Sequence, residues 1–597
     1  MASECEGAAT AAAVPYTLLG LLLQGDRSTA AAASDGACAV SGLGGFGFVR
    51  AYVERATNAV LWAGLVAVTA LLLRRLGRLA RLWAEGSRIP GPPCTSFCGH
   101  SKLIPVGANL TGYLPKLHEK YGPIVRLWLG PTQLLVSVTD LALIKEVLTK
   151  AEDKLPLTGS AFRLAFGNSS LFAPSFDKVQ RKRESLENHL NSKLHGRSSA
   201  ISLKVVNHVL ERVDSITASG LVDCREMSQH MAFYVIGATL FGDSFLAWSN
   251  AAIYEEILMM IAKDASFWAS YNVPPIWKRG FLKYRQLCSR LKCLTRDILQ
   301  QCGKKYKLLE QIDQSSTSRR TRDEAVEDSS FIIDDILAEG MLLEEIDEYL
   351  ISKDEPCGNI MGMMFHGCLT TSGLINSILT SLAMNPEIQD KIFSEIVEVN
   401  KRDSEPHLFD IQKMRFLLAT VYESARLLSA GSLLQRCSLK HDLKLRTSIT
   451  IPAGAILVVP VQLVQMDVSI WGKDACQFNP LRFLSKSIEH ESTASGWEDD
   501  SVPKTALSGA SQHDSEESCI SPCLPRAISG FLPFGAGQRA CVGQKFALLG
   551  ISTLLASLLQ VYEIRLHTVQ ENDVVPMRNE VVYQRFPSQK IQFVKRS

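Results

Sequence analysis

The sequence predicts a mainly α-helical protein with small β-sheets, preceded by a single N-terminal membrane helix. Helical periodicity dominates from Asp140 to about Glu310 and returns in "GNIMGMMFHGCLTTSGLINSILTSLAM". Apolar runs in "PIVRLWLGPTQLLVSVT" are short and typical of two strands with a turn between them at Gly130 and Pro131. Residues 56–73 carry no charge and have about the length that one membrane helix needs.

The N-terminal region divides into three predicted segments. Residues 1–55 are rich in Ala, Gly and Ser and form a low-complexity tail, and residues 56–73 are the membrane anchor. The basic "RRLGRLARLW" that follows favours the cytosolic side, so the rest of the chain should face the cytosol. Residues 74–93 end in the proline-rich "IPGPP" and are predicted to be a hinge. A buried core helix is the alternative for 56–73, and a cleaved signal peptide fits less well because Met1 lies far away.

The remaining residues, 94–597, are predicted to be one catalytic domain. "YLPKLHEKYG" predicts an amphipathic helix that ends at Gly122, and "NPE" predicts a helix start with Asn385 as N-cap. "KMRFLLATVYESARLLS" and "GQKFALLGISTLLASLLQVY" predict two further helices, and "TSITIPAGAILVVPV" predicts short strands. Two polar inserts, about 311–330 and about 484–525, interrupt the domain.

Composition narrows the class of protein. Hydrophobic residues make up 46% of the chain and charged residues 21%, which is ordinary for a globular protein. A net charge of +2 gives no basic excess, so nucleic acid is not an expected partner. The 15 cysteines are scattered along a chain too long to need a disulfide framework, which indicates a reducing compartment.

The stretch "FLPFGAGQRACVG" allows three interpretations. "GAGQRA" fits a loose dinucleotide-binding pattern, but Pro533 precedes it and no acidic residue follows before Glu563, so that context is absent. Cys541 could be a catalytic thiol whose pKa is lowered by the following helix N-terminus, although the segment offers no histidine as a base. Cys541 could also be a buried structural cysteine without a chemical role. The third interpretation is a metal ligand.

A haem-binding thiolate accounts for more of these residues. Glycines let the backbone approach the sulfur closely, Arg539 can neutralise haem propionates, and Phe534 can form an apolar wall. Haem iron held by a cysteine thiolate is the arrangement of one known class of oxygen-activating enzymes.

The same stretch resembles the haem-binding loop of the cytochrome P450 family, F-x-x-G-x-R-x-C-x-G. The matching residues are Phe534, Gly537, Arg539, Cys541 and Gly543. "ESAR" is similar to the family's E-x-x-R with Glu423 and Arg426, and "FNPLRF" is similar to its P-x-R-F element with Arg482. "PGPP" resembles the proline hinge of membrane-anchored microsomal members.

The resemblance implies a cytochrome P450 fold, haem b as cofactor and Cys541 as the axial ligand of the iron. Arg539, Arg436 and Arg183 are then expected to bind the haem propionates, and Glu423, Arg426 and Arg482 to form a structural cluster. The family's W-x-x-x-R element falls at "VQRKR", where Val179 stands in place of tryptophan.

The long helix departs from the family pattern A/G-G-x-D/E-T-T/S, whose acid and alcohol deliver protons during oxygen activation. In "HGCLTT", Gly367 and Thr370 match, His366 replaces the small residue, and Leu369 replaces the acid. His366 is either a core residue or a proton relay, since the pKa of histidine is ordinarily near physiological pH. Thr370 and His366 are therefore the candidate catalytic residues.

The implied function is a monooxygenase of the endoplasmic reticulum membrane. It would take NADPH electrons from NADPH–cytochrome P450 reductase and insert one oxygen atom into an apolar small molecule. The general branch resembles plant members that act on terpenoids, sterols or hormones. Two alternatives remain open: a haem-thiolate isomerase or dehydratase that does not activate O2, and a non-enzymatic haem-binding protein.

Overall fold

The structure is a computed structural model of the 597-residue chain. It describes residues 44–94, 96, 99–100, 110–154, 171–173, 175–187, 190, 204–209, 211, 221–269, 278–316, 355–402, 411–427, 429, 431, 433–438, 440–484, 530–567 and 589–596.

The chain divides into two compact units, Met1–Arg78 and Leu79–Ser597. Helix α2, Gly44–Gly86, begins in the first unit and ends in the second. Its segment Tyr52–Gly86 is long and apolar enough to cross a membrane, and none of its most apolar window is buried. The helix is longer than the predicted anchor, because no proline interrupts the chain between Gly44 and Gly86.

This length corrects two predicted boundaries. Residues 44–55, predicted as tail, and residues 74–86, predicted as hinge, are both helical. The predicted hinge keeps its proline-rich part after Gly86, where Pro90 and its neighbours have no regular structure. Residues 1–43 of the predicted tail lie outside the described residues.

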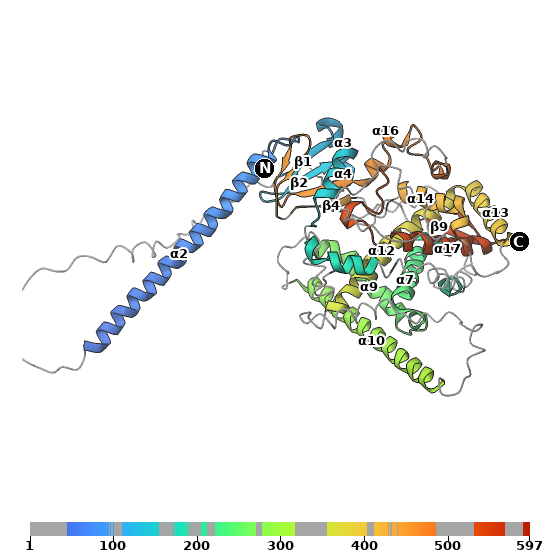
Figure 1. Ribbon diagram of the computed structural model, residues 1–597, viewed down its shortest axis with the longest axis horizontal. Helices are drawn as coiled ribbons and strands as arrows, with labels where there is room; N and C mark the ends of the chain where they lie inside the picture. Colours follow the sequence, from blue (N-terminus) through green and yellow to red (C-terminus); the bar gives the residue numbers. More distant parts are fainter. Residues whose placement is uncertain are drawn as a thin grey trace, which may run out of the picture. The chain divides into compact units, whose positions relative to one another are not determined.

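The second unit is mainly helical (Figure 1). Its helices are α3 Leu110–Tyr121, α4 Leu141–Lys150, α7 Cys224–Phe241, α8 Asp243–Leu246, α9 Ala251–Ala269, α10 Arg279–Ser316, α12 Glu355–Met384, α13 Pro386–Arg402, α14 Arg415–Leu427, α15 Val461–Gln465, α16 Val468–Trp471 and α17 Gln544–Val561. Short 3-10 helices are η1 Phe176–Lys178, η2 Ile411–Lys413, η3 Pro480–Phe483 and η5 Gly537–Arg539.

The described residues of this unit also form three small sheets. Their strands are β1 Ile124–Trp128, β2 Leu134–Val138, β3 Val222–Asp223, β4 Leu433–Arg436, β5 Leu443–Lys444, β6 Thr450–Ile451, β7 Ile456–Pro460, β8 Tyr562–Leu566 and β9 Lys590–Lys595. The largest sheet has the order β1-β2-β7-β4, and the others have the orders β3-β9-β8 and β5-β6.

The four-stranded sheet is buried on both faces. Strands β2 and β7 run parallel, with Val136 opposite Leu457, and every residue of both strands is buried. Alternate side chains enter different cores: Val136 joins one cluster and Leu135 the other. Strand β4 pairs antiparallel with β7 and forms one edge of the sheet. Arg436 is the last residue of β4.

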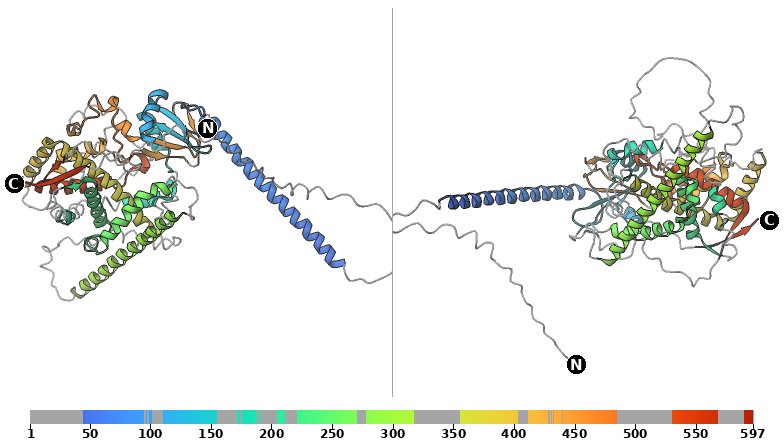
Figure 2. Two further views of the ribbon diagram at one scale, coloured as in Figure 1. Left: turned by 180° about the vertical axis from the view of Figure 1, so that it is seen from behind. Right: turned by 90° about the horizontal axis from the view of Figure 1, so that it is seen from below.

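The long helix α12 forms the centre of the helical core. It packs against α7 along much of its length and also contacts α13 and α14. Ile360, Met364, Ile375 and Leu379 on α12 are almost fully buried. The views from behind and below also show α12 among the other helices of the second unit (Figure 2).

Most predicted elements of the body are confirmed. Helix α3 ends before Gly122, α13 begins at Pro386, and Gly130 forms the β1–β2 turn with a positive φ. Helix α10 continues through Ser316 and so includes the first residues of the polar insert expected at about 311–330. Residues 317–330 and 485–525 lie outside the described residues.

Candidate functional site

The loop before α17 folds around Cys541. The Cys541 amide donates a hydrogen bond to the Phe534 carbonyl (2.9 Å), which closes the loop into a compact turn. Helix η5 lies inside this turn, and α17 begins three residues after the cysteine. No strand precedes the loop within residues 530–536, so the dinucleotide interpretation fails in the structure as well.

Gly537 is fixed by close approach to another helix. Its φ is +69°, and a Cβ atom there would lie 2.4 Å from the Leu148 carbonyl oxygen at the end of α4. Any other residue would therefore push the loop away from α4. The glycine beside the sulfur is Gly543, whose amide donates a hydrogen bond to the Cys541 thiol.

The Cys541 side chain is exposed, yet burial of its surroundings raises its pKa. The Gly543 amide, Arg183 and Lys154 act in the opposite direction and favour the thiolate, but less strongly. The expectation that the helix N-terminus makes this a low-pKa thiol is therefore wrong for the chain on its own.

Two arginines reach the loop from different elements. Arg183, in the helical residues 180–187, donates from Nη2 to the Ala540 carbonyl. Arg539 donates from Nε to the Glu152 carbonyl (2.9 Å) and lies over the Phe176 ring, 5.2 Å from its centroid. Both guanidinium groups are buried enough to lower their pKa, that of Arg539 to about 10.

Arg436 has a buried polar atom without a partner. The residue is 2% exposed, and its Nε makes no hydrogen bond among the described residues. Its Nη1 donates to the adjacent Gln435 carbonyl (2.9 Å), and its Nη2 donates weakly to the Ala536 carbonyl (3.4 Å). Burial, with the charges of Arg539 and Arg183, lowers the pKa of Arg436 to about 10.

The sequence analysis missed a fourth cation, Lys154. Asp153 pairs with Cys437 in an antiparallel bridge, which places Lys154 next to the end of β4. Burial of its surroundings and the charges of the three arginines lower the pKa of Lys154 to about 7. No local motif marks this lysine, since its position depends on a pairing between distant segments.

Helix α12 presents Thr370 and His366 on one face. Both residues are exposed, whereas Met364, Phe365 and Cys368 on the same helix are buried. The Thr370 hydroxyl donates to the His366 carbonyl (2.8 Å), one turn earlier. The His366 ring lies 4.9 Å from the ring of Phe172.

The pKa of His366 is lower than a proton relay at physiological pH would require. Burial of its surroundings, and to a lesser degree the charge of Lys154, lowers its pKa to about 4. The imidazole is therefore neutral near physiological pH, and the expected relay pKa is wrong. Because Lys154 acts on both His366 and Cys541, this face of α12 and the cysteine loop border the same region.

Leu369 belongs to the core. It is 6% exposed and packs in the large helical cluster, one helix position away from the exposed Thr370. Gly367 is half-buried, and a Cβ atom there would lie 3.1 Å from Ile236 of α7. Leu369 and Gly367 of the "HGCLTT" motif thus pack α12 against its neighbours.

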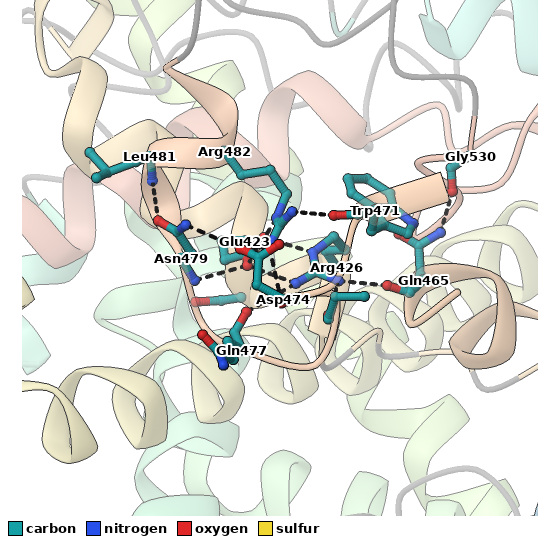
Figure 3. Close-up of polar contacts among 12 residues, drawn as sticks. Glu423, Arg426, Gln465, Trp471, Asp474, Gln477, Asn479, Leu481, Arg482 and Gly530 are labelled. Atoms are coloured by element: carbon teal, nitrogen blue, oxygen red, sulfur yellow. Dashed lines mark hydrogen bonds and ion pairs between the residues drawn. The ribbon is translucent and has the colours of Figure 1, made fainter. Parts of the chain in front are cut away.

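Glu423 and Arg426 form a fully buried ion pair (Figure 3). Arg426 donates from Nε and Nη2 to the two carboxylate oxygens of Glu423, both at 2.7 Å. Its Nη1 donates to the carbonyls of Gln465 (2.6 Å) and Ala475 (2.7 Å), so both side chains are well satisfied.

Arg482 completes the predicted cluster. Its Nε lies 3.6 Å from Glu423 Oε1, its Nη1 donates to the Trp471 carbonyl (2.5 Å), and its Nη2 donates to Asp474 Oδ2 (2.7 Å). Figure 3 shows both guanidinium groups directed toward the Glu423 carboxylate. One carboxylate thereby joins α14 to η3 and the residue just before it, Asn479.

Comparison with known proteins decides the family. The cytochrome P450 family model matches residues 89–592, which is most of the chain. The chain belongs to the cytochrome P450 family.

Similar P450 enzymes come from plants and a fungus, which agrees with the plant-like resemblance. An 11-oxo-beta-amyrin 30-oxidase of Glycyrrhiza uralensis is 28% identical, over 75% of this chain and 76% of its own length. A cytokinin hydroxylase of Arabidopsis thaliana is 26% identical, over 83% and 85%. Cytochrome P450 monooxygenase 91 of Postia placenta is 24% identical, over 83% and 91%.

This membership gives the activity class and the cofactor at the level of the family. The chain is a cytochrome P450 monooxygenase, and the family uses haem iron and electrons from a redox partner. The residues near Cys541 fit a haem. The exposed Cys541 thiol could supply an iron ligand, and the unpartnered Arg436 Nε could supply a donor for an anionic propionate.

Proposed function

We propose that this P450 is a haem-thiolate monooxygenase in which Cys541 would supply the thiolate that binds the haem iron. The cationic cluster around that thiol carries the proposal, above all the buried, unpartnered Nε of Arg436. Arg183, Arg436 and Arg539 bind the haem propionates, and Phe534 packs beside the cysteine. Breaking the Glu423–Arg426–Arg482 cluster would disorganise the segment that precedes this loop.

The bound haem supplies the iron at which O2 is reduced and one oxygen atom is transferred. The protein contributes the Cys541 Sγ, and the Gly543 amide together with Arg183 stabilises negative charge there. Glycines at 537 and 543 keep the loop close to its neighbours. Burial excludes water, which strengthens each of these interactions.

Thr370 of α12 is the proposed proton-handling residue. Its hydroxyl donates to the His366 carbonyl and keeps an oxygen lone pair for a water or a substrate. His366 is neutral, so its imidazole can accept or donate a hydrogen bond without carrying a charge. Leu369 cannot transfer a proton, so water or His366 must deliver protons to Thr370.

The substrate is proposed to be an apolar small molecule of terpenoid, sterol or hormone-like chemistry. The relatives support this class, since one is named as an oxidase of 11-oxo-beta-amyrin and another as a hydroxylase of cytokinins. Electrons are proposed to come from NADPH through NADPH–cytochrome P450 reductase. The segment 56–73 of α2 is the proposed single anchor in the endoplasmic reticulum membrane, with the body facing the cytosol.

A second candidate function is a haem-thiolate isomerase or dehydratase. The replacement of the family's acid by the buried Leu369 favours it, because such chemistry needs no proton delivery to oxygen. Thr370 favours the monooxygenase, since an exposed hydroxyl is retained on the same face of α12 as His366.

A reconstitution experiment distinguishes the two functions. Purified holoprotein with NADPH–cytochrome P450 reductase is screened against a panel of terpenoids and sterols, and NADPH oxidation, product and hydrogen peroxide are all measured. A monooxygenase gives ligand-dependent product with some uncoupled peroxide, and Thr370→Ala lowers the ratio of product to NADPH. Rearrangement of a hydroperoxide without NADPH, together with no NADPH consumption, would overturn the proposal.

A further inference from the structure

Helix α12 carries an imidazole at a position where the P450 pattern has a small residue. His366 is the first residue of "HGCLTT", at which the pattern has alanine or glycine. It lies one helical turn before Thr370, so the two side chains share a face of the helix. Both are exposed, and the Thr370 hydroxyl donates to the His366 carbonyl (2.8 Å). A ring with two nitrogen atoms thus lies on the same face as the proposed proton-handling hydroxyl.

Residues 171–173 connect α12 to the cysteine loop. Their first amide, that of Leu171, donates to Asn359 Oδ1 of α12 (3.1 Å). Their last carbonyl, that of Ala173, accepts a weak hydrogen bond from Arg539 Nη2 (3.4 Å). Because Arg539 belongs to the cysteine loop, three consecutive residues contact both the long helix and that loop.

Phe172, the middle residue of this segment, lies against His366. The two ring centroids are 4.9 Å apart, with an angle of 35° between the ring planes. The charge of Lys154 also acts to lower the pKa of both His366 and Cys541, so it lies near both side chains. The ring contact and this shared charge agree that His366 and Cys541 border one region.

The His366 ring has the chemistry of an iron ligand. Its pKa of about 4 makes the imidazole neutral at physiological pH, and the neutral imidazole is the form that binds metals. Histidine and cysteine both serve as axial ligands of haem iron. A haem iron that takes a thiolate from Cys541 has a second axial position, which a nitrogen ligand can occupy. Alanine or glycine at residue 366 would leave that position to water.

We propose that His366 binds the haem iron as its second axial ligand while no substrate is bound. The inference rests on the proposed haem site and adds a means of regulation to it. The neutral imidazole replaces a water molecule, so no electron moves and no proton is released. Substrate must then displace a side chain of the enzyme itself, which protects the iron until a substrate is present.

The first test examines the iron of the substrate-free, full-length ferric holoprotein. Histidine with isotopically labelled nitrogen is incorporated, and electron paramagnetic resonance measures hyperfine coupling between the iron and that nitrogen. We expect strong coupling in the unsubstituted chain and its loss in His366→Ala. His366→Phe, which keeps a ring but has no nitrogen, should lose it as well. His441→Ala is the control, since His441 is exposed at the surface, and should keep the coupling.

The second test measures how far the side chain occupies the iron. A protein ligand that occupies the iron in about nine of ten molecules weakens the binding of an external ligand about ten-fold. His366→Ala should therefore bind free imidazole about ten-fold more tightly than the unsubstituted chain does. Its absorption spectrum at saturation should match that of the unsubstituted chain without imidazole, and His441→Ala should behave like the unsubstituted chain.

The outcomes separate this inference from the proposed function. Absence of nitrogen coupling in the unsubstituted holoprotein would show that the inference is wrong, although the haem site stands. A spectrum that changes in His366→Ala without such coupling would mean that His366 only contacts a water on the iron, and this also overturns the inference. The measurement on the unsubstituted chain decides the question even if neither variant of His366 accumulates. Failure of the unsubstituted chain to bind haem would instead refute the proposed function.

Discussion

The Cys541 sulfur is held between opposing electrostatic effects. Burial of its surroundings favours the neutral thiol, while the Gly543 amide and two nearby cations favour the thiolate. Burial is the larger effect, so the protein alone does not make a reactive thiolate. Coordination to a metal deprotonates a thiol outright, and the loop is therefore suited to a ligand and poorly suited to a free nucleophile.

Replacing Cys541 by alanine should remove thiolate ligation. We expect Cys541→Ala to lose the red-shifted ferrous–CO band of a haem-thiolate protein, because no other sulfur takes its place. Cys476→Ala is the control, since Cys476 is also exposed but lies outside the loop. Retention of the red-shifted band in Cys541→Ala would show that another residue is the ligand.

His366 should make the body less stable in acid. Its pKa is about 4 in the folded chain against an ordinary value of 6.5, so the unfolded chain binds the proton first as pH falls. Stability is therefore lost between about pH 6.5 and pH 4 and is unaffected by this group at higher pH. Thermal unfolding followed from pH 7 to pH 4 should show a shallower decline for His366→Gln.

His441→Gln serves as the control for that measurement, because His441 is exposed at the surface. Its decline should match that of the unsubstituted chain. An equally steep decline in His366→Gln would mean that His366 is solvated in the folded protein.

At the scale of elements, α14 is joined to the segment around η3 by one carboxylate. Glu423 accepts from Arg426 and from the Asn479 amide (3.0 Å) and lies within ion-pair distance of Arg482. The Trp471 ring lies 5.0 Å from the Arg426 guanidinium and covers it. A buried pair with every donor satisfied holds a unique arrangement, whereas half of the pair would leave a buried charge.

Glu423→Ala should therefore give little holoprotein. Removing one partner of a buried ion pair costs roughly 3–5 kcal/mol of unfolding free energy. Here Arg426 would lose its carboxylate partner, while Arg482 would keep Asp474. Thermal unfolding and haem content per chain are the measurements. Glu563→Ala is the matched control, because its pair with Arg565 lies at the surface of β8 and should have no measurable effect. Equal haem content in the two variants would contradict the structural role of the cluster.

Local sequence predicted the elements whose signals are local. The turn at Gly130, the start of α13 at Pro386 and the apolar helix through residues 56–73 follow from residue types at fixed spacing. The E-x-x-R pair was also visible, but its complete burial depends on Gln465 and Ala475, which are distant in sequence. Burial of this kind is a property of packing and leaves no local pattern.

The candidate site was predictable to the same extent. The cysteine loop has a dense motif, so its residues were identified directly. Lys154 was not, because only the bridge between Asp153 and Cys437 places it beside Arg436. The pKa of His366 was misjudged for a related reason: desolvation depends on the neighbours of α12, which the motif does not specify.

At the scale of the whole molecule, the second unit begins inside a helix. Its first residue is Leu79, and the last turns of α2 after it pack on the four-stranded sheet. The Trp83 and Trp128 rings stack with centroids 4.0 Å apart, and Trp83 Nε1 donates to the Pro131 carbonyl (2.7 Å). Arg81 forms an ion pair with Asp442 at 2.5 Å. Residues 79–86 thus belong structurally to the catalytic body.

Two truncations should therefore differ in stability. A chain lacking residues 1–78 keeps the Trp83 stack and should bind haem with full thermal stability. A chain lacking residues 1–88 exposes Trp128, which is 1% exposed in the structure, and loses both the stack and its hydrogen bond. The lost aromatic contact and buried area amount to about 2 kcal/mol, which lowers the midpoint of thermal unfolding by a few degrees.

Trp83→Ala in the full-length chain provides the control for this comparison, because it removes the stack while leaving the rest of α2 in place. Its unfolding midpoint should fall by about as much as that of the longer truncation. If both truncations unfold at the same temperature, residues 79–88 do not stabilise the second unit against thermal unfolding. If only the longer truncation is destabilised, a soluble form of this P450 for haem-binding work should begin at Leu79, before the proline-rich segment.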